Sequence, residues 1–148
     1  MHIIFAVDQR EGLISYKWAD ELYRYIVGAC QNRKHFVYAI NGTIDHIHLL
    51  VGMHPSDSVS ELVQSLKIQS SKWINDKFHH GAFGWQSGFG AFSYSKSMIP
   101  AVQKYIESQR EHHKRIRFED ELKAIFDKAG IDYKPEYMMK GYADISPT

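Results

Sequence analysis

Apolar positions with a period of two recur along the chain and predict four strands. Residues 2–7 are expected to form the first strand, because His2 is followed by a continuous apolar run typical of a buried strand. Residues 36–40 are rich in β-branched and aromatic side chains, Asn41-Gly42 is a typical hairpin turn, and residues 43–51 return as the partner strand. Apolar and polar residues also alternate over 91–95. The second and third strands are therefore expected to form a hairpin.

Apolar positions at spacings of three and four predict helices between these strands. The first helix is expected from Trp18 to Cys30, where one apolar stripe recurs. Residues 58–61 read Ser-Val-Ser-Glu, the capping-box pattern that satisfies free backbone amides at a helix start. A long helix is expected to follow this box, with an apolar face that continues to Ile74.

Two further helices are expected near the carboxyl end. Ser97 as an N-cap and Pro100 in the first turn predict a helix over 98–115. An amphipathic pattern predicts a last helix from Phe118 to Ala129, with Gly130 as its C-terminal cap. The order of elements indicates an α+β domain of the ferredoxin-like (RRM-like) kind. Such a domain has a four-stranded, mainly antiparallel sheet with helices packed on a face.

Composition is that of one globular domain. The 148 residues are 44% hydrophobic and 24% charged, and we expect a single domain over 1–133 with a C-terminal tail over 134–148. Apolar runs are too short for a membrane span, and the first residues lack the features of a signal peptide. Cys30 is the only cysteine, which excludes an intramolecular disulfide and favours the cytoplasm.

The net charge of +1 does not by itself indicate a nucleic-acid partner, but basic residues are clustered. Lys114, Arg115 and Arg117 form one group, and Lys67 and Lys72 recur along the second helix. These five residues are candidates for contacts with phosphate groups. A solvated charged surface is the more common explanation of each single group, and only the number of groups favours a polyanionic partner.

Two histidines at a spacing of two lie in the segment from Asp45 to Val51. Alternation along a strand places the imidazoles of His46 and His48 on one face and the apolar residues between them on the other. Such a pair can share a metal ion or a phosphate group, and one further ligand would complete a minimal site. Two half-exposed strand histidines without a ligand are the alternative, and the pair alone does not select zinc over magnesium or manganese.

Tyr105 and Gln109 lie four residues apart on the predicted helix, so their side chains share one face. A tyrosine in this position is more often a packing residue than a nucleophile. Its phenol can nevertheless attack phosphorus if a metal ion polarises the phosphate and another group takes the proton.

Residues 85–92 combine glycines, which permit close backbone approach, with aromatic rings that can stack on bases. Trp85 and Phe89 are the candidate stacking residues. A glycine-rich turn leading into an aromatic strand explains the same residues equally well.

Three of these segments together resemble the single-tyrosine HUH transposases of small bacterial insertion sequences, where HUH denotes histidine, a hydrophobic residue and histidine. The matching segments read NGTIDHIHLLV over 41–51, WQSGFGAFS over 85–93 and YIESQ over 105–109, and they occur in the order of the family. The resemblance extends from the first strand to the last helix, and it implies the HUH nuclease core as the fold.

The resemblance implies a DNA strand transferase that acts on single-stranded ends folded as imperfect hairpins. His46, His48 and Gln109 are then the ligands of Mg²⁺ or Mn²⁺, and Tyr105 is the nucleophile that holds the 5′ phosphate covalently. Members of the family act as homodimers, in which the tyrosine helix of one subunit completes the histidine site of the other.

Two other functions are compatible with the same residues. A histidine-motif nucleotide phosphohydrolase also uses His-x-His, but the histidine-triad type requires a third histidine where this chain has Leu50. A catalytically silent module that binds hairpin DNA or RNA would leave the combination of His46, His48 and Gln109 without a purpose.

Overall fold

The structure is a computed structural model that describes residues 1–8, 13–79, 82–112 and 118–129. In chain order its elements are β1 (His2–Ala6), α1 (Ala19–Asn32), β2 (Phe36–Gly42), β3 (His46–Gly52), α2 (Val59–Ile74), a π-helical turn (Asn75–His79), β4 (Gly90–Phe92), a 3-10 turn (Lys96–Met98), α3 (Ile99–Glu107), α4 (Gln109–His112) and α5 (Phe118–Ala129).

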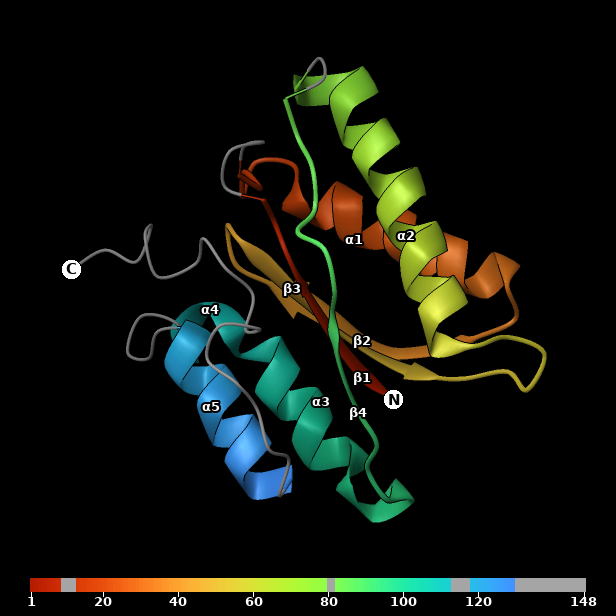
Figure 1. Ribbon diagram of the computed structural model, residues 1–148, viewed down its shortest axis with the longest axis vertical. Coiled ribbons are helices and arrows are strands. Elements are labelled where there is room, and N and C mark those ends of the chain that lie inside the picture. Colours follow the sequence, from red (N-terminus) through yellow and green to blue (C-terminus); the bar gives the residue numbers. More distant parts are fainter. Residues whose placement is uncertain (9–12, 80–81, 113–117, 130–148) are drawn as a thin grey trace.

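The four strands form one sheet in the order β2-β3-β1-β4, and every neighbouring pair is antiparallel. This arrangement confirms the α+β, ferredoxin-like prediction. Helices cover both faces of the sheet rather than one, with α1 and α2 on one side and α3 on the other (Figure 1). The sheet is therefore the middle layer of the molecule.

Strand alternation gives the two faces of the sheet different chemistry. In β3, Ile47, Leu49 and Val51 point into the main core beneath α1 and α2, where all three are fully buried. The residues between them face α3, and among these His46 and His48 are also fully buried. The first face is consequently an apolar core, whereas the second contains buried polar groups.

The predicted start of α2 is confirmed, but only half of the capping box forms, because the backbone N–H of Ser58 donates to Oδ1 of Asp57. Ser58 has an extended backbone, and its side chain accepts a hydrogen bond from the backbone N–H of Glu61. The predicted apolar face is also observed, since Leu62, Val63 and Leu66 are buried in the main core. Helix α2 therefore begins directly after Ser58, and its apolar face packs on the sheet.

The predicted hairpin turn at Asn41-Gly42 is wrong, because both residues belong to β2. The backbone N–H of Thr43 donates to the carbonyl of His46 over 3.0 Å, so the chain turns at Ile44 and Asp45. Gly42 serves a different purpose, since a Cβ atom there would lie 2.2 Å from the His46 carbonyl oxygen. The glycine permits close approach of two strands.

The single helix predicted over 98–115 is also wrong. Helix α3 ends at Glu107, and α4 begins at Gln109 after a turn at Ser108. The side-chain amide of Asn41 donates to the carbonyls of Ile106 and Glu107, each over 3.0 Å. Those carbonyls would otherwise accept bonds from the next helical turn, so a side chain of β2 ends the helix.

The start of α3 differs from the prediction as well. Ser97 lies inside the 3-10 turn, where its hydroxyl contacts that of Ser95, and it does not cap α3. Pro100 does lie in the first turn of α3, as expected. The strand predicted over 91–95 is shorter and is β4, whereas the last helix, α5, has the predicted bounds.

Gly130 and the tail expected over 134–148 lie outside the described residues, so the proposed domain boundary stays a prediction. Among the helices of the described residues, none is long and apolar enough to cross a membrane.

Candidate functional site

The polar site lies between β3 and the helices on the second face of the sheet. His46 and His48 come from alternate positions of β3, and their ring centroids are 5.0 Å apart. The Nε2 atoms of both rings approach the same carboxylate oxygen, Oε1 of Glu121, at 3.9 Å from His46 and 3.0 Å from His48. The two histidines that the sequence analysis selected therefore do point into a shared space.

The other nitrogen of His46 is engaged by neighbouring residues. Its Nδ1 atom lies 3.0 Å from Oδ1 of Asp45 and 2.9 Å from the hydroxyl of Thr43. The Thr43 hydroxyl also donates to the same Asp45 oxygen. A carboxylate at Nδ1 favours the tautomer with a proton on Nδ1, which leaves the Nε2 lone pair available for a ligand.

His48 has its own partner on the neighbouring strand. The Nδ1 atom of His48 lies 2.8 Å from Nε2 of His2, and the far nitrogen of His2 lies 3.4 Å from the hydroxyl of Tyr94. Burial, followed by the adjacent His48, lowers the pKa of His2 to about 3. His2 is thus a neutral partner that fixes the orientation of the His48 ring.

Tyr105 and Gln109 reach the histidines from the helices above them. The ring of Tyr105 lies edge-on to His48 with centroids 5.7 Å apart, and Oε1 of Gln109 lies 3.4 Å from Nε2 of His46. The break at Ser108 does not separate the pair, because the Gln109 amide still approaches the Tyr105 carbonyl at 3.5 Å. Within one chain, Tyr105 therefore lies beside its own histidines.

Glu121 of α5 completes this group of side chains. It is 3% exposed, and its Oε2 atom accepts a short hydrogen bond from the Tyr105 hydroxyl. Oε2 also lies 3.5 Å from the Gln109 amide nitrogen. One carboxylate therefore contacts the tyrosine, the glutamine and both histidines.

The environment of Tyr105 keeps its hydroxyl protonated. Burial raises the pKa of this phenol well above its ordinary value, and the negative charge of Glu121 raises it further. A phenol in this state is a weak nucleophile. It requires a group that takes its proton and a positive charge near the atom that it attacks.

The donor set fits a divalent cation. Ligand atoms of His46, His48 and Glu121 lie within 4.8 Å of one another, and all three residues are buried. The amide oxygen of Gln109 is adjacent. Imidazole nitrogen together with amide and carboxylate oxygen can hold a divalent metal ion, and the Asp45 carboxylate at Nδ1 of His46 is the kind of partner that orients metal-binding histidines.

A family model described as "Transposase IS200 like" matches residues 1–109. The match covers about three quarters of the chain and includes both histidines, Tyr105 and Gln109. The chain belongs to this transposase family.

Similar proteins agree with that assignment. The transposase is 25% identical over 117 residues to the ISDra2 transposase TnpA of Deinococcus radiodurans, and the match covers 74% of this chain and 83% of the relative. A solved structure of a candidate transposase from Deinococcus radiodurans is 24% identical, with a TM-score of 0.58, and the match covers 73% of this chain and 88% of that one.

A second solved structure is that of a REP-associated tyrosine transposase bound to a REP hairpin. It is 17% identical with a TM-score of 0.57, and the match covers 80% of this chain and 71% of that one. At these identities, both solved structures support the fold of the transposase.

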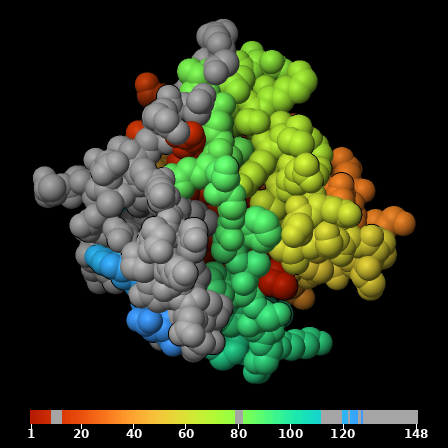
Figure 2. Space-filling model, in the orientation of Figure 1, coloured from red at the N-terminus to blue at the C-terminus, as the bar shows by residue number. Residues whose placement is uncertain are grey.

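Two of the candidate DNA-binding residues, Lys67 and Trp85, are tied to neighbouring segments of the protein. The ammonium group of Lys67 donates to the carbonyls of Gln86 and Gly88, and burial lowers its pKa to about 8. The indole N–H of Trp85 donates to the Ser70 hydroxyl over 2.9 Å. These contacts hold residues 85–88 against α2. Figure 2 shows this segment in green beside that helix.

The other candidates are at the surface or outside the described residues. Phe89 is 36% exposed, and the ammonium group of Lys72 pairs with Asp76 on the solvent side of α2. Lys114, Arg115 and Arg117 lie outside the part of the chain that the structure describes. A role in DNA binding stays a prediction for all of these residues.

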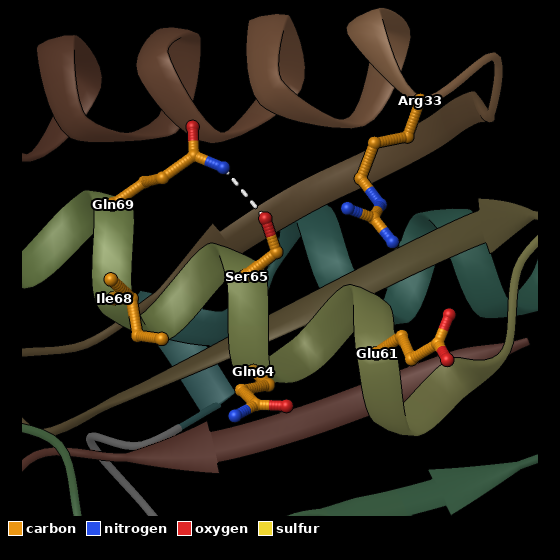
Figure 3. Close-up of a pocket in the computed structure, with 6 residues that line it drawn as sticks. All are labelled: Arg33, Glu61, Gln64, Ser65, Ile68 and Gln69. Carbon is orange, nitrogen blue, oxygen red and sulfur yellow. Dashed lines mark hydrogen bonds between the residues drawn. The ribbon is translucent and has the colours of Figure 1, made fainter.

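A separate hollow lies at the surface of α2, the helix that covers the other face of the sheet, and none of the residues of the histidine site lines it (Figure 3). Its lining residues come mainly from the outer face of α2, with Arg33 at one side. The guanidinium group of Arg33 makes two hydrogen bonds to the carboxylate of Asp57 at 2.6 and 2.7 Å. This pair ties the end of α1 to the start of α2 and has a structural role.

The sequence analysis missed His2 and Glu121. Glu121 is three residues after Phe118 and four before Ile125, so an acidic residue interrupts the apolar face of the last predicted helix. That interruption was a usable signal. His2 faces the site because β1 pairs with β3 in the register that places His2 opposite Leu50. The local sequence does not reveal this register.

Proposed function

We propose that the transposase cleaves and rejoins single-stranded DNA through a covalent 5′-phosphotyrosine at Tyr105. The observation that supports this proposal is the convergence of the Tyr105 hydroxyl, the two histidine Nε2 atoms and the Gln109 amide oxygen on one buried site. A half-buried tyrosine whose hydroxyl faces two buried imidazoles is more than a packing arrangement requires. It provides a nucleophile next to a set of metal ligands.

His46, His48 and Gln109 would hold the divalent cation, as the sequence analysis expects. A bound Mg²⁺ or Mn²⁺ supplies positive charge that polarises the scissile phosphate. Asp45 and Thr43 orient one ligand ring, and His2 orients the other. The second face of the sheet is therefore arranged to bind and orient a phosphate group beside Tyr105.

Cleavage attaches the 5′ phosphate end of one DNA strand to the protein and releases a 3′ hydroxyl on the other. The Tyr105 oxygen forms a bond to phosphorus while the bond from phosphorus to the 3′ oxygen breaks. The phenol loses its proton, and the departing 3′ oxygen gains one. Attack by a different 3′ hydroxyl on the phosphotyrosine then reseals a strand and restores the phenol, so no nucleotide cofactor is needed.

The substrate in this proposal is single-stranded DNA with hairpin ends. A relative of the same fold is bound to a REP hairpin, which supports this choice of substrate. We also propose that two chains act together as a homodimer, and that the protein works in the cytoplasm. The buried Cys30 thiol, whose pKa burial raises to about 12, is suited to a reducing compartment.

Single-stranded hairpin oligonucleotides from the flanks of the gene test this function. After incubation with Mg²⁺ or Mn²⁺, a denaturing gel should show a protein–DNA adduct that resists SDS. The Tyr105→Phe variant should lose the adduct, whereas the control Tyr25→Phe, on α1 and stacked on Trp73, should keep it.

Other results would select the alternatives. An adduct that survives in Tyr105→Phe would assign the nucleophile to another residue. A shift in mobility without cleavage would identify a silent hairpin-binding module, and multiple-turnover hydrolysis of mononucleotides would identify a phosphohydrolase. Light scattering tests the dimer separately, because a strictly monomeric active protein would contradict a shared site.

A further inference from the structure

The carboxylate of Glu121 is buried within the site but was not among the expected ligands. It comes from α5, beyond the residues that the family model matches. Lys, Glu, Arg and Asp side chains are rarely fully buried without partners, because the loss of hydration is costly. A glutamate that is 3% exposed in this position therefore requires a charge or donors that compensate for burial.

The two oxygen atoms of Glu121 have different partners. Oε1 faces the histidines, at 3.0 Å from Nε2 of His48 and 3.9 Å from Nε2 of His46. Oε2 faces the other way and accepts the hydrogen bond of the Tyr105 hydroxyl. The carboxylate thus lies between the metal-binding histidines and the nucleophile.

Charge balance makes this position significant. The imidazoles of His46 and His48 and the amide of Gln109 are neutral donors, so none of these three ligands offsets the charge of a divalent cation, and the nearby Asp45 carboxylate contacts His46 at Nδ1, the ring nitrogen that faces away from the shared space. Oxygen donors with negative charge are also those that Mg²⁺ and Mn²⁺ prefer. Glu121 can supply one negative charge and one oxygen ligand. This oxygen lies within 4.8 Å of the ligand nitrogens of His46 and His48.

We propose that Glu121 is the fourth protein ligand of the divalent-cation site and that its second oxygen holds the Tyr105 hydroxyl beside that site. This inference rests on the proposed metal-dependent function. It adds a residue from α5 to the ligand set of His46, His48 and Gln109. It also explains why an acidic side chain interrupts the apolar face of an amphipathic helix.

Direct measurement of Mn²⁺ binding by the full chain tests the proposal without DNA. Loss of an outer-shell partner typically weakens metal affinity about 10- to 100-fold, so loss of a charged ligand in Glu121→Gln should weaken Mn²⁺ binding by at least that factor. Calorimetry or the electron paramagnetic resonance signal of free Mn²⁺ measures the change. Asp120→Asn, which removes the exposed carboxylate of the preceding residue, should bind Mn²⁺ as the unaltered protein does.

A second variant separates ligation from folding. Glu121→Asp keeps the charge on a shorter side chain and should recover part of the lost affinity, whereas a purely structural role would give no such recovery. Circular dichroism and thermal melting establish that each variant is folded. Mn²⁺ binding by folded Glu121→Gln that is unchanged or tighter would overturn the proposal, and tighter binding would show that the carboxylate only occupies the space of the ion.

The controls also separate this inference from the proposed function. Tyr105→Phe should form no adduct but should still bind Mn²⁺, with an affinity reduced at most as for the loss of one outer-shell partner, while His46→Ala should lose Mn²⁺ binding. Tyr25→Phe, on α1, should bind Mn²⁺ as the unaltered protein does. If the unaltered protein binds Mn²⁺ in a Glu121-dependent way but forms no adduct, the proposed function fails and the ligand assignment holds. If adducts form and Glu121→Gln leaves Mn²⁺ affinity unchanged, the ligand assignment alone fails.

Discussion

The two faces of the sheet use the same strands for different purposes. On the face beneath α1 and α2, β3 contributes Ile47, Leu49 and Val51 to a continuous apolar core. On the face beneath α3, the same strand contributes His46 and His48 to a buried polar cluster. Both sets are equally inaccessible to solvent, so burial alone does not distinguish a core residue from a functional one.

What distinguishes the faces is the pattern of hydrogen bonds. Core side chains are stabilised by removal of apolar surface from water, whereas each buried histidine has a specific partner at Nδ1 and a shared space at Nε2. Substitutions on the first face should therefore reduce stability, and substitutions on the second should reduce metal binding. Adjacent residues of one strand allow that contrast to be measured.

The largest effect is expected from Leu49→Ala. Removal of a fully buried leucine leaves a cavity and should lower the free energy of unfolding by about 2–5 kcal/mol, while the folded fraction still binds Mn²⁺. His46→Ala should show the reverse, with loss of Mn²⁺ binding and a smaller loss of stability. Urea denaturation and Mn²⁺ titration measure the two quantities, and equal losses of stability in both variants would remove the distinction between the faces.

An intermediate effect is expected from His2→Phe, which keeps a ring but removes the contact with Nδ1 of His48. Because that contact orients a metal ligand, Mn²⁺ affinity should fall about 10- to 100-fold with the fold retained. His2→Gln, which keeps a hydrogen-bonding group, should recover part of the affinity. Unchanged affinity in His2→Phe would show that His2 only fills space beneath Tyr94.

The smallest effect is expected from Asp57→Asn, far from the histidine site, and it should depend on pH. Hydrogen bonds from the Arg33 guanidinium, and next from His35, lower the pKa of Asp57 well below its ordinary value of 3.8. The folded state therefore holds the proton of Asp57 less tightly than the unfolded state does. The stabilisation is present above about pH 3.8 and is lost as the pH falls below it.

Urea unfolding at several pH values measures this dependence. At pH 6 the substitution should cost about 1.5–3 kcal/mol, the range for hydrogen bonds to charged groups. The difference between Asp57→Asn and the unaltered protein should stay constant from pH 6 to just above 3.8 and shrink as the pH falls below that value towards 3. A difference that is constant over the whole of this range would contradict the assigned role of the Arg33–Asp57–His35 cluster.

Local patterns in the sequence predicted the parts of the fold that depend on local physics. The cap pattern at Ser58 correctly predicted the start of α2, and strand alternation correctly predicted that His46 and His48 lie on one face of the sheet. Two of the errors, the hairpin turn and the long helix, involve Asn41, whose side chain acts across more than sixty residues of sequence on the carbonyl groups at the end of α3. Sequence signals for turns and helices do not include contacts of this kind.

The site was likewise only partly predictable. The resemblance to a family supplied Tyr105 and Gln109, and the structure brings both to the histidines. His2 and Glu121 enter the site through the pairing of β1 with β3 and through the position of α5, which are tertiary relationships. Short-range periodicity does not show which residues meet in space. The acidic residue in the apolar face of α5 nevertheless marked Glu121 as unusual.

Mass spectrometry of the protein–DNA adduct tests the central claim most directly. The transposase is incubated with a single-stranded hairpin and Mn²⁺, and is then digested with nuclease and trypsin. Cleavage after Lys104 and Arg110 releases residues 105–110, which contain Tyr105 as the only tyrosine. We predict a nucleotide attached through a phosphodiester to this peptide, and a nucleotide attached to any other peptide would contradict the account.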